Sequence, residues 1–168
     1  MSHVINKVEW YLKKAQKELK KSKKHRGIIK IEPDLNKAKE HINKAEHYLK
    51  ATNYLKKGNF SDISASTVFY SMYHCLLAIA LKLGYESRNQ ECTFALIYYL
   101  IEERKINFDE NLLNKIASLD IEEGEKTSVE IGEQYQYVTN LSLKDNLYEE
   151  LFELAKNIIS RTKEIIEG

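Results

Sequence analysis

Apolar residues recur at alternating spacings of three and four along most of the chain, which is the period of an amphipathic α-helix. Ile5, Val8, Leu12, Ala15 and Leu19 show this spacing and predict a helix over residues 3–24. No segment shows the strict alternation of a half-buried strand. The pattern predicts an all-α fold, an antiparallel up-and-down bundle of four to five core helices with an additional N-terminal helix. The expected further helices cover residues 34–57, 61–83, 89–104, 109–122 and 142–166.

The helix expected over residues 61–83 is the most apolar of these and should be the most enclosed. It nevertheless carries hydroxyl, aromatic and imidazole groups. Each buried polar group that lacks a hydrogen-bond partner destabilises the fold by roughly 1–3 kcal/mol. This helix is therefore either the centre of a bundle or the wall of a site. Its polar members are Thr67, Tyr70, Ser71, Tyr73 and His74.

Helix ends carry several local signals. Asp34 is placed to cap the second helix, and Ser61 or Asp62 the third. Gly84 is expected to end the third helix in the left-handed conformation. Ser142 and Asp145 form a capping-box pattern before the last helix. We interpret residues 123–141 as a loop with some helix.

Charge is distributed unevenly, although the net charge is only +1. Residues 1–57 carry 16 Lys and Arg against 6 Asp and Glu, and the remainder carries 10 against 19. We expect residues 1–33 to form a basic amphipathic helix and connector, and residues 34–168 to form the bundle. The basic cluster fits either a surface for a phosphate backbone or a solubilising face. Its candidate binding residues are Lys13, Lys17, Lys20, Lys21, Lys24 and Arg26.

Other classes of protein find no support in the sequence. Cys75 and Cys92 are isolated in apolar surroundings, as expected of buried thiols in a reducing cytoplasm. We expect neither a secretory signal nor a membrane span, because the apolar run of residues 68–83 is short and interrupted. His41 and His47 are six residues apart, unlike a zinc-binding pair, and resemble surface pairs with neighbouring glutamates. The predicted location is cytoplasmic, with no metal and no cofactor.

Four stretches resemble the HEPN domain family in its stand-alone archaeal and bacterial form. Together they span about residues 34–166. The second and third stretches are the most specific, because the others are ordinary helix patterns. They are AKEHINKAEHYLKATNYLKKGNFSD at 38–62, STVFYSMYHCLLAIALKLGY at 66–85, SRNQECT at 87–93, and Tyr135 followed by a closing helix.

This resemblance implies a helical bundle that forms a homodimer and is often encoded beside a small nucleotidyltransferase, as in toxin–antitoxin pairs. Some HEPN proteins are metal-independent ribonucleases with an Arg, a polar residue and a later His. Arg88 and Asn89 match the opening of that motif, whereas Thr93 stands at a position where its His would be expected. We therefore lean towards a binding module rather than an enzyme.

The candidate site for a nucleotide or RNA phosphate consists of Arg88, Asn89, Tyr70, His74 and Tyr135. Tyr70 and His74 share a helix face, and Arg88 and Asn89 precede a helix N-terminus, where anions bind readily. Each pair also has a structural interpretation, as core hydrogen bonding or as a capped turn. Two other functions stay open. One is a ribonuclease in which Arg88, His74 and Tyr70 are catalytic, and the other is a purely structural dimer.

Overall fold

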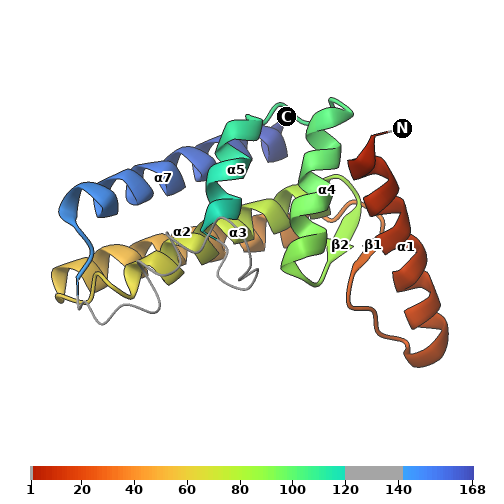
Figure 1. Ribbon diagram of the computed structural model, residues 1–168, viewed down its shortest axis with the longest axis horizontal. Helices are drawn as coiled ribbons and strands as arrows, with labels where there is room; N and C mark the ends of the chain where they lie inside the picture. Colours follow the sequence, from red (N-terminus) through yellow and green to blue (C-terminus); the bar gives the residue numbers. More distant parts are fainter. Residues whose placement is uncertain (1, 120–141) are drawn as a thin grey trace.

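The computed structural model describes residues 2–119 and 142–168, and its described part is an elongated helical bundle (Figure 1). Three long helices run along the molecule, while α1, α4 and α5 cross its long axis. The prediction of an all-α bundle with an added N-terminal helix is confirmed. The helices are α1 (His3–Ser22), α2 (Leu35–Lys57), α3 (Ser64–Lys82), α4 (Gln90–Glu102), α5 (Glu110–Ser118) and α7 (Asp145–Glu167).

The most enclosed helix is α3, which packs against α2 and α7 on its long sides. Phe69, Met72, Leu76 and Ile79 are each no more than 2% exposed. Burial of such side chains stabilises a fold by about 1.5–3 kcal/mol each. Ala38 and Ala45 of α2 are fully buried, so that the backbones of α2 and α3 approach closely.

Two polar groups of α3 are hydrogen-bonded to α2. Ser71 Oγ donates to the Ala45 carbonyl oxygen at 2.7 Å, and the hydroxyls of Thr67 and Thr52 lie 2.7 Å apart. Because each buried group has a partner, the helix can be both apolar and specific in its register. The expectation that these groups find partners inside the bundle is confirmed for both hydroxyls.

By length and composition, α3 also qualifies as a candidate membrane span, contrary to our expectation from the sequence. Its mean hydropathy over the most apolar window is 1.3. However, 67% of that window is buried inside the protein, which is the position of a core helix.

Two helix ends agree with the sequence and two do not. Asp34 Oδ1 accepts from the Lys37 amide, and Gly84 has the expected positive φ of 85°. In contrast, α3 begins after Ile63 and α7 after Lys144, and neither start has a side-chain cap. Ser61 instead accepts the Leu143 amide hydrogen, 82 residues away, and so ties the start of α7 to that of α3.

A small antiparallel ribbon was missed by the sequence analysis. Strand β1 (Ile28–Lys30) pairs with β2 (Tyr85–Ser87), and Ile29 lies opposite Glu86. Strands of three residues are too short to show a hydrophobic period. The ribbon matters for the site because it joins the segment after α1 to the turn that carries Arg88.

Both cysteines are free and buried, as predicted. Burial raises the pKa of Cys75 to about 12 and raises that of Cys92. A buried thiol of this kind is a packing element rather than a nucleophile.

Candidate functional site

The residues proposed from the sequence as one site fall into two separate clusters. His74 and Tyr70 belong to an aromatic cluster on α2 and α3, which also contains His41 and Tyr48. Arg88 belongs to a second group of residues around the turn before α4. No direct contact joins His74 to Arg88 in the described part of the chain, so the structure does not bring them together.

Within the aromatic cluster, the two histidines contact each other directly. His41 Nδ1 and His74 Nδ1 are 2.9 Å apart, and the Tyr48 ring stacks on the His74 ring with centroids separated by 5.5 Å. The interpretation of His41 as a surface partner of a glutamate was therefore wrong. One ring must donate and the other accept, so the pair holds one proton between the two nitrogens.

Both histidines have lowered pKa values. Burial lowers the pKa of His74 to about 4, and the nearby His41 and Lys44 act in the same direction. Burial and Lys37 lower the pKa of His41, against the opposing effect of Glu40. The rings are neutral at neutral pH and satisfy each other, which is a structural role and provides no positive charge for a phosphate.

The second group, which we call the motif turn, consists of His25, Arg26, Glu86, Arg88 and Asn89. Glu86 Oε1 accepts from Arg88 Nε at 2.9 Å and lies 2.8 Å from His25 Nε2. The Arg88 amide donates to the Gly27 carbonyl oxygen at 2.9 Å. The histidine that the fold places beside Arg88 is thus His25, to which the sequence assigned no role. Its partner is 61 residues away, and no local signal could have revealed it.

Glu86 is a charged partner in this turn. Burial by itself raises the pKa of Glu86, but hydrogen bonds from His25 and Arg88 outweigh it and lower the pKa below its usual value. The carboxylate therefore stays ionised and partly neutralises Arg88. About half of the Arg88 side chain, 51%, remains exposed, so the guanidinium is still accessible to a ligand.

Asn89 caps α4, the structural role that the sequence also allowed. Its Oδ1 accepts the Cys92 amide hydrogen at 2.7 Å, and its Nδ2 donates to the Arg26 carbonyl oxygen at 2.6 Å. We call the segment between α1 and β1, residues 23–27, the connector. Asn89 therefore fixes this connector against the start of α4.

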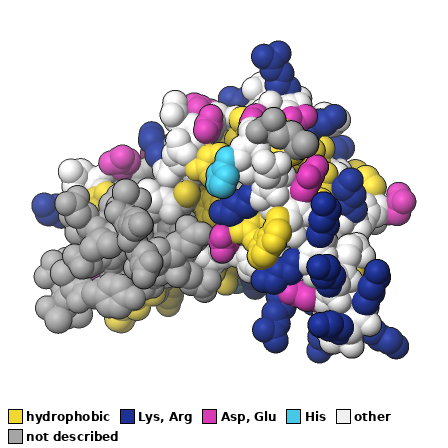
Figure 2. Space-filling model, turned by 45° about the vertical axis from the view of Figure 1, so that its right-hand side comes forward, with side chains coloured by type: hydrophobic (Ala, Val, Ile, Leu, Met, Phe, Trp, Pro, Cys, Tyr) yellow, Lys and Arg dark blue, Asp and Glu magenta, His cyan; other side chains and the backbone are white. Residues whose placement is uncertain are grey.

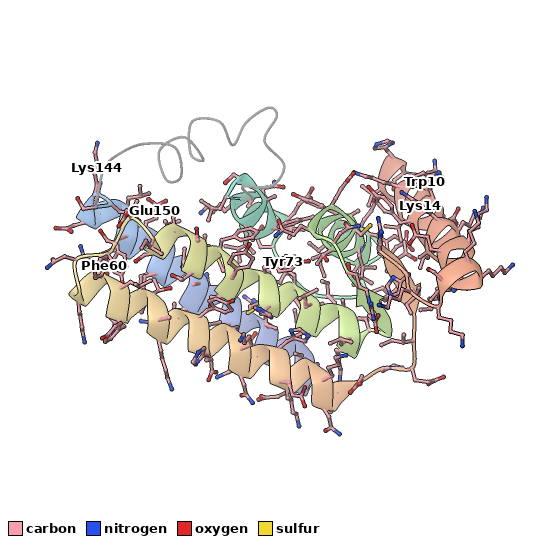
Figure 3. The ribbon with its side chains drawn as sticks, turned by 90° about the horizontal axis from the view of Figure 1, so that it is seen from below. Trp10, Lys14, Phe60, Tyr73, Lys144 and Glu150 are labelled. Atoms are coloured by element: carbon pink, nitrogen blue, oxygen red, sulfur yellow. The ribbon has the colours of Figure 1, made fainter. Side chains whose placement is uncertain are left out.

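Thr93 is fully buried in a hydroxyl network at the same turn. Its Oγ1 donates to the Asn89 carbonyl oxygen at 2.8 Å and lies 2.7 Å from Ser87 Oγ and 3.0 Å from Tyr73 Oη. Tyr73 (labelled in Figure 3) reaches this network from α3. The position expected for a motif histidine is thus filled by a residue that stabilises the turn.

A pocket of about 620 Å³ lies between α1, the connector and the start of α4. It unites two features that the sequence presented separately, the basic N-terminal segment and the Arg-Asn motif. The pocket forms only when α1 docks on α4, and local sequence patterns do not predict this docking. Its lining residues include Trp10, Lys14, Glu18, Arg26, Asn89 and Glu91.

The other residues of the predicted basic surface are exposed on and after α1. Figure 2 shows lysine and arginine side chains gathered on this end of the molecule. A second hollow of about 490 Å³ lies beside Lys13, Lys17, Lys20 and Lys30. It lies on the opposite flank of α1 from the first pocket, so cations are present on both flanks of the helix.

Two remaining sequence expectations concern Tyr135 and metal ions. Tyr135 lies outside the described residues. Among the residues described, no group of three or more His, Cys, Asp or Glu side chains could hold a metal ion.

Comparison with known proteins identifies the family. No curated protein matches the chain. A family model described as the HEPN domain matches residues 38–167. The matched segment begins within α2, so α1, the connector and β1 precede it. Because the match covers most of the sequence, the chain belongs to the HEPN domain family.

Proposed function

We propose that this HEPN protein binds single-stranded RNA at the end of the molecule where α1 meets α4. A HEPN domain points to a function related to nucleotides or RNA. The observation that carries the proposal is the lining of one pocket by Lys14 and Arg26 from the basic segment and by Asn89 from the Arg-Asn motif. Arg88 directly precedes Asn89 and remains half exposed.

The charge of this end supports contacts to a phosphate backbone. Lys13, Lys17 and Lys20 are exposed on α1, and Lys30 from β1 lines the same hollow. Cations in such an arrangement release counterions from a nucleic acid, and the resulting binding depends little on sequence and strongly on salt. A surface of this kind guides an RNA strand towards the motif turn.

Binding is better supported than cleavage. A metal-independent ribonuclease needs an acid or base within reach of the phosphate held by arginine. Thr93 fills the expected position, and His74 pairs with His41 in another cluster. His25 lies beside Arg88, but only 3% of it is exposed.

Fluorescence anisotropy with a short labelled RNA tests the proposal. Replacing Lys13, Lys17 and Lys20 by alanine should weaken binding at least about tenfold and reduce the salt slope by roughly two, since each phosphate contact contributes about 0.7 on a single strand. The matched control replaces Lys39, Lys50 and Lys57, which are exposed on α2. It should bind RNA as the unmodified protein does.

The same RNA incubated with protein and a chelator distinguishes the other functions. We expect the RNA to remain intact. Cleavage that disappears on Arg88→Ala would establish a ribonuclease instead. Absence of RNA binding even at low salt would favour a purely structural dimer.

A further inference from the structure

We infer that the pocket between α1 and α4 holds one unpaired guanine base of the bound RNA, stacked on Trp10, with its phosphate against Lys14 and Arg26. This inference rests on the proposed RNA binding and adds a base preference to it. Most of the pocket's lining comes from α1 and the connector, which precede the segment matched by the family, whereas Asn89, Glu91 and Cys92 belong to that segment. Its volume of about 620 Å³ falls in the range of roughly 300–1,000 Å³ that small-molecule sites occupy.

Trp10 provides the stacking surface. It is 57% exposed although it is large and apolar, and it lines the pocket. Lys14 lies one turn further along α1, with Nζ 5.1 Å from the centre of the Trp10 ring (Figure 3). An exposed aromatic ring beside a flexible cation matches the two parts of a nucleotide, because bases stack on aromatic rings and phosphates bind ammonium groups.

Two carboxylates in the same pocket account for the choice of base. Glu18 Oε2 accepts the Arg26 amide hydrogen at 2.7 Å, and Glu91 Oε1 accepts from the Tyr11 hydroxyl at 2.5 Å. Among the bonds of the described residues, the second oxygen of each carboxylate is unused. The hydrogen bond from Tyr11, helped by Lys7 and opposed by burial, lowers the pKa of Glu91, so this group is an ionised acceptor at neutral pH.

An ionised carboxylate only accepts hydrogen bonds, and it favours two donors side by side. The Watson–Crick edge of guanine presents N1–H and N2–H in that arrangement. Uracil presents one donor between two carbonyl oxygens, which a carboxylate repels. The lining carries two cations, Lys14 and Arg26, and two carboxylates, Glu18 and Glu91, and Lys7 pairs with Glu91 from outside the lining. This mixed lining suits an anionic phosphate joined to a donor-rich base better than it suits phosphate alone.

Intrinsic fluorescence provides a direct test, because Trp10 is the only tryptophan in the chain. Titration with guanosine monophosphate should quench it, and uridine monophosphate should require at least about tenfold higher concentration, the loss expected from an unpaired polar edge. Ribose 5-phosphate should leave the fluorescence unchanged. Equal quenching by both nucleotides would overturn the base preference, and quenching by neither would overturn the site.

RNA-binding variants separate this inference from the proposed function. Trp10→Leu should weaken binding of a guanine-rich RNA about tenfold without changing the salt slope, whereas Trp10→Phe should retain most of the affinity. Glu91→Gln should reduce the preference for guanine over uracil. Tyr54→Leu is the matched control, since Tyr54 is 78% exposed on α2. Each variant should unfold at the same temperature as the unmodified protein.

The pocket inference and the proposed RNA binding are refuted by different results. Loss of binding in the α1 lysine variant, together with unchanged binding and base preference in Trp10→Leu, would refute the pocket inference and leave RNA binding intact. No RNA binding by the unmodified protein would refute the proposed function itself.

Discussion

The α2–α3–α7 bundle and the junction of α1 with α4 hold their polar groups in different ways. Inside the bundle the partners are neutral, such as the hydroxyl of Ser71 on a backbone carbonyl and the paired rings of His41 and His74, and charged pairs such as Lys163 with Glu46 lie on its surface. At the junction, neutral partners such as Thr93 with Ser87 are joined by charged ones, as in Arg88 with Glu86. Charged pairs at the junction stay partly in water, whereas buried charges would be costly in the bundle.

This difference separates the polar groups that specify the fold from those that can bind a ligand. A neutral pair that is satisfied inside the bundle has little left to offer. A charged group that is half exposed, such as Arg88, can exchange its protein partner for a phosphate at small cost. The polar residues of the most apolar helix therefore mark the core, and the candidate site lies at the periphery.

The largest expected effect comes from the bundle. Leu76→Ala removes a fully buried side chain of α3 and should lower the free energy of unfolding by about 2–5 kcal/mol. Urea denaturation measures the loss. Leu35→Ala is the matched control, because Leu35 is 39% exposed on α2 and should change stability by less than about 0.5 kcal/mol. Similar losses in both variants would show that α3 is not the core that we describe.

The sequence predicts the bundle well because its information is local. The three-and-four spacing of apolar residues locates the helices, and Asp34 and Gly84 mark ends that the structure confirms. Ser61 shows the limit of this approach. It has the character of a helix cap, yet its oxygen accepts from an amide 82 residues away.

The candidate site is less predictable because its contacts join distant segments. The ribbon of β1 and β2 and the bond between His25 and Glu86 depend on the docking of the N-terminal segment on the bundle. Sequence reasoning identified Arg88 and Asn89 but combined them with His74, which the fold places in a different cluster. Trp10 has no counterpart in the sequence expectations, since the pocket that it lines exists only in three dimensions.

A smaller effect concerns pH and the histidine pair of the bundle. The pKa of His74 is lowered from 6.5 to about 4 in the folded protein, so in this interval the unfolded chain binds more protons. Stability should therefore fall as the pH decreases from neutral towards about 4.5. Because the rings are only half-buried, we expect a loss of about 1 kcal/mol rather than the full equivalent of the shift.

Urea denaturation of His74→Phe at neutral pH and at about pH 4.5 tests this expectation. The variant keeps an aromatic ring but cannot titrate, so its acid-induced loss should be clearly smaller. His47→Phe, at an exposed position on α2, should behave as the unmodified protein does. The carboxylates with lowered pKa values, such as Glu86, lose most of their stabilising contribution below about pH 4.5, where an unfolded glutamate is more than half protonated. An unchanged acid-induced loss in His74→Phe would show that another group is responsible.

The smallest expected effect is on RNA binding at the junction of α1 with α4. Glu86→Gln removes the carboxylate that competes with phosphate for Arg88, while the amide oxygen can still accept a hydrogen bond from its Nε. RNA affinity should therefore rise about threefold, the scale of one partly exposed ion pair. Anisotropy at low salt measures the change. Glu153→Gln, which removes the surface partner of Lys156 on α7, should leave affinity unaltered. If Glu86→Gln binds RNA more weakly, the carboxylate positions Arg88 for the ligand instead of competing with it, and the motif turn would then resemble the bundle in requiring its internal partners.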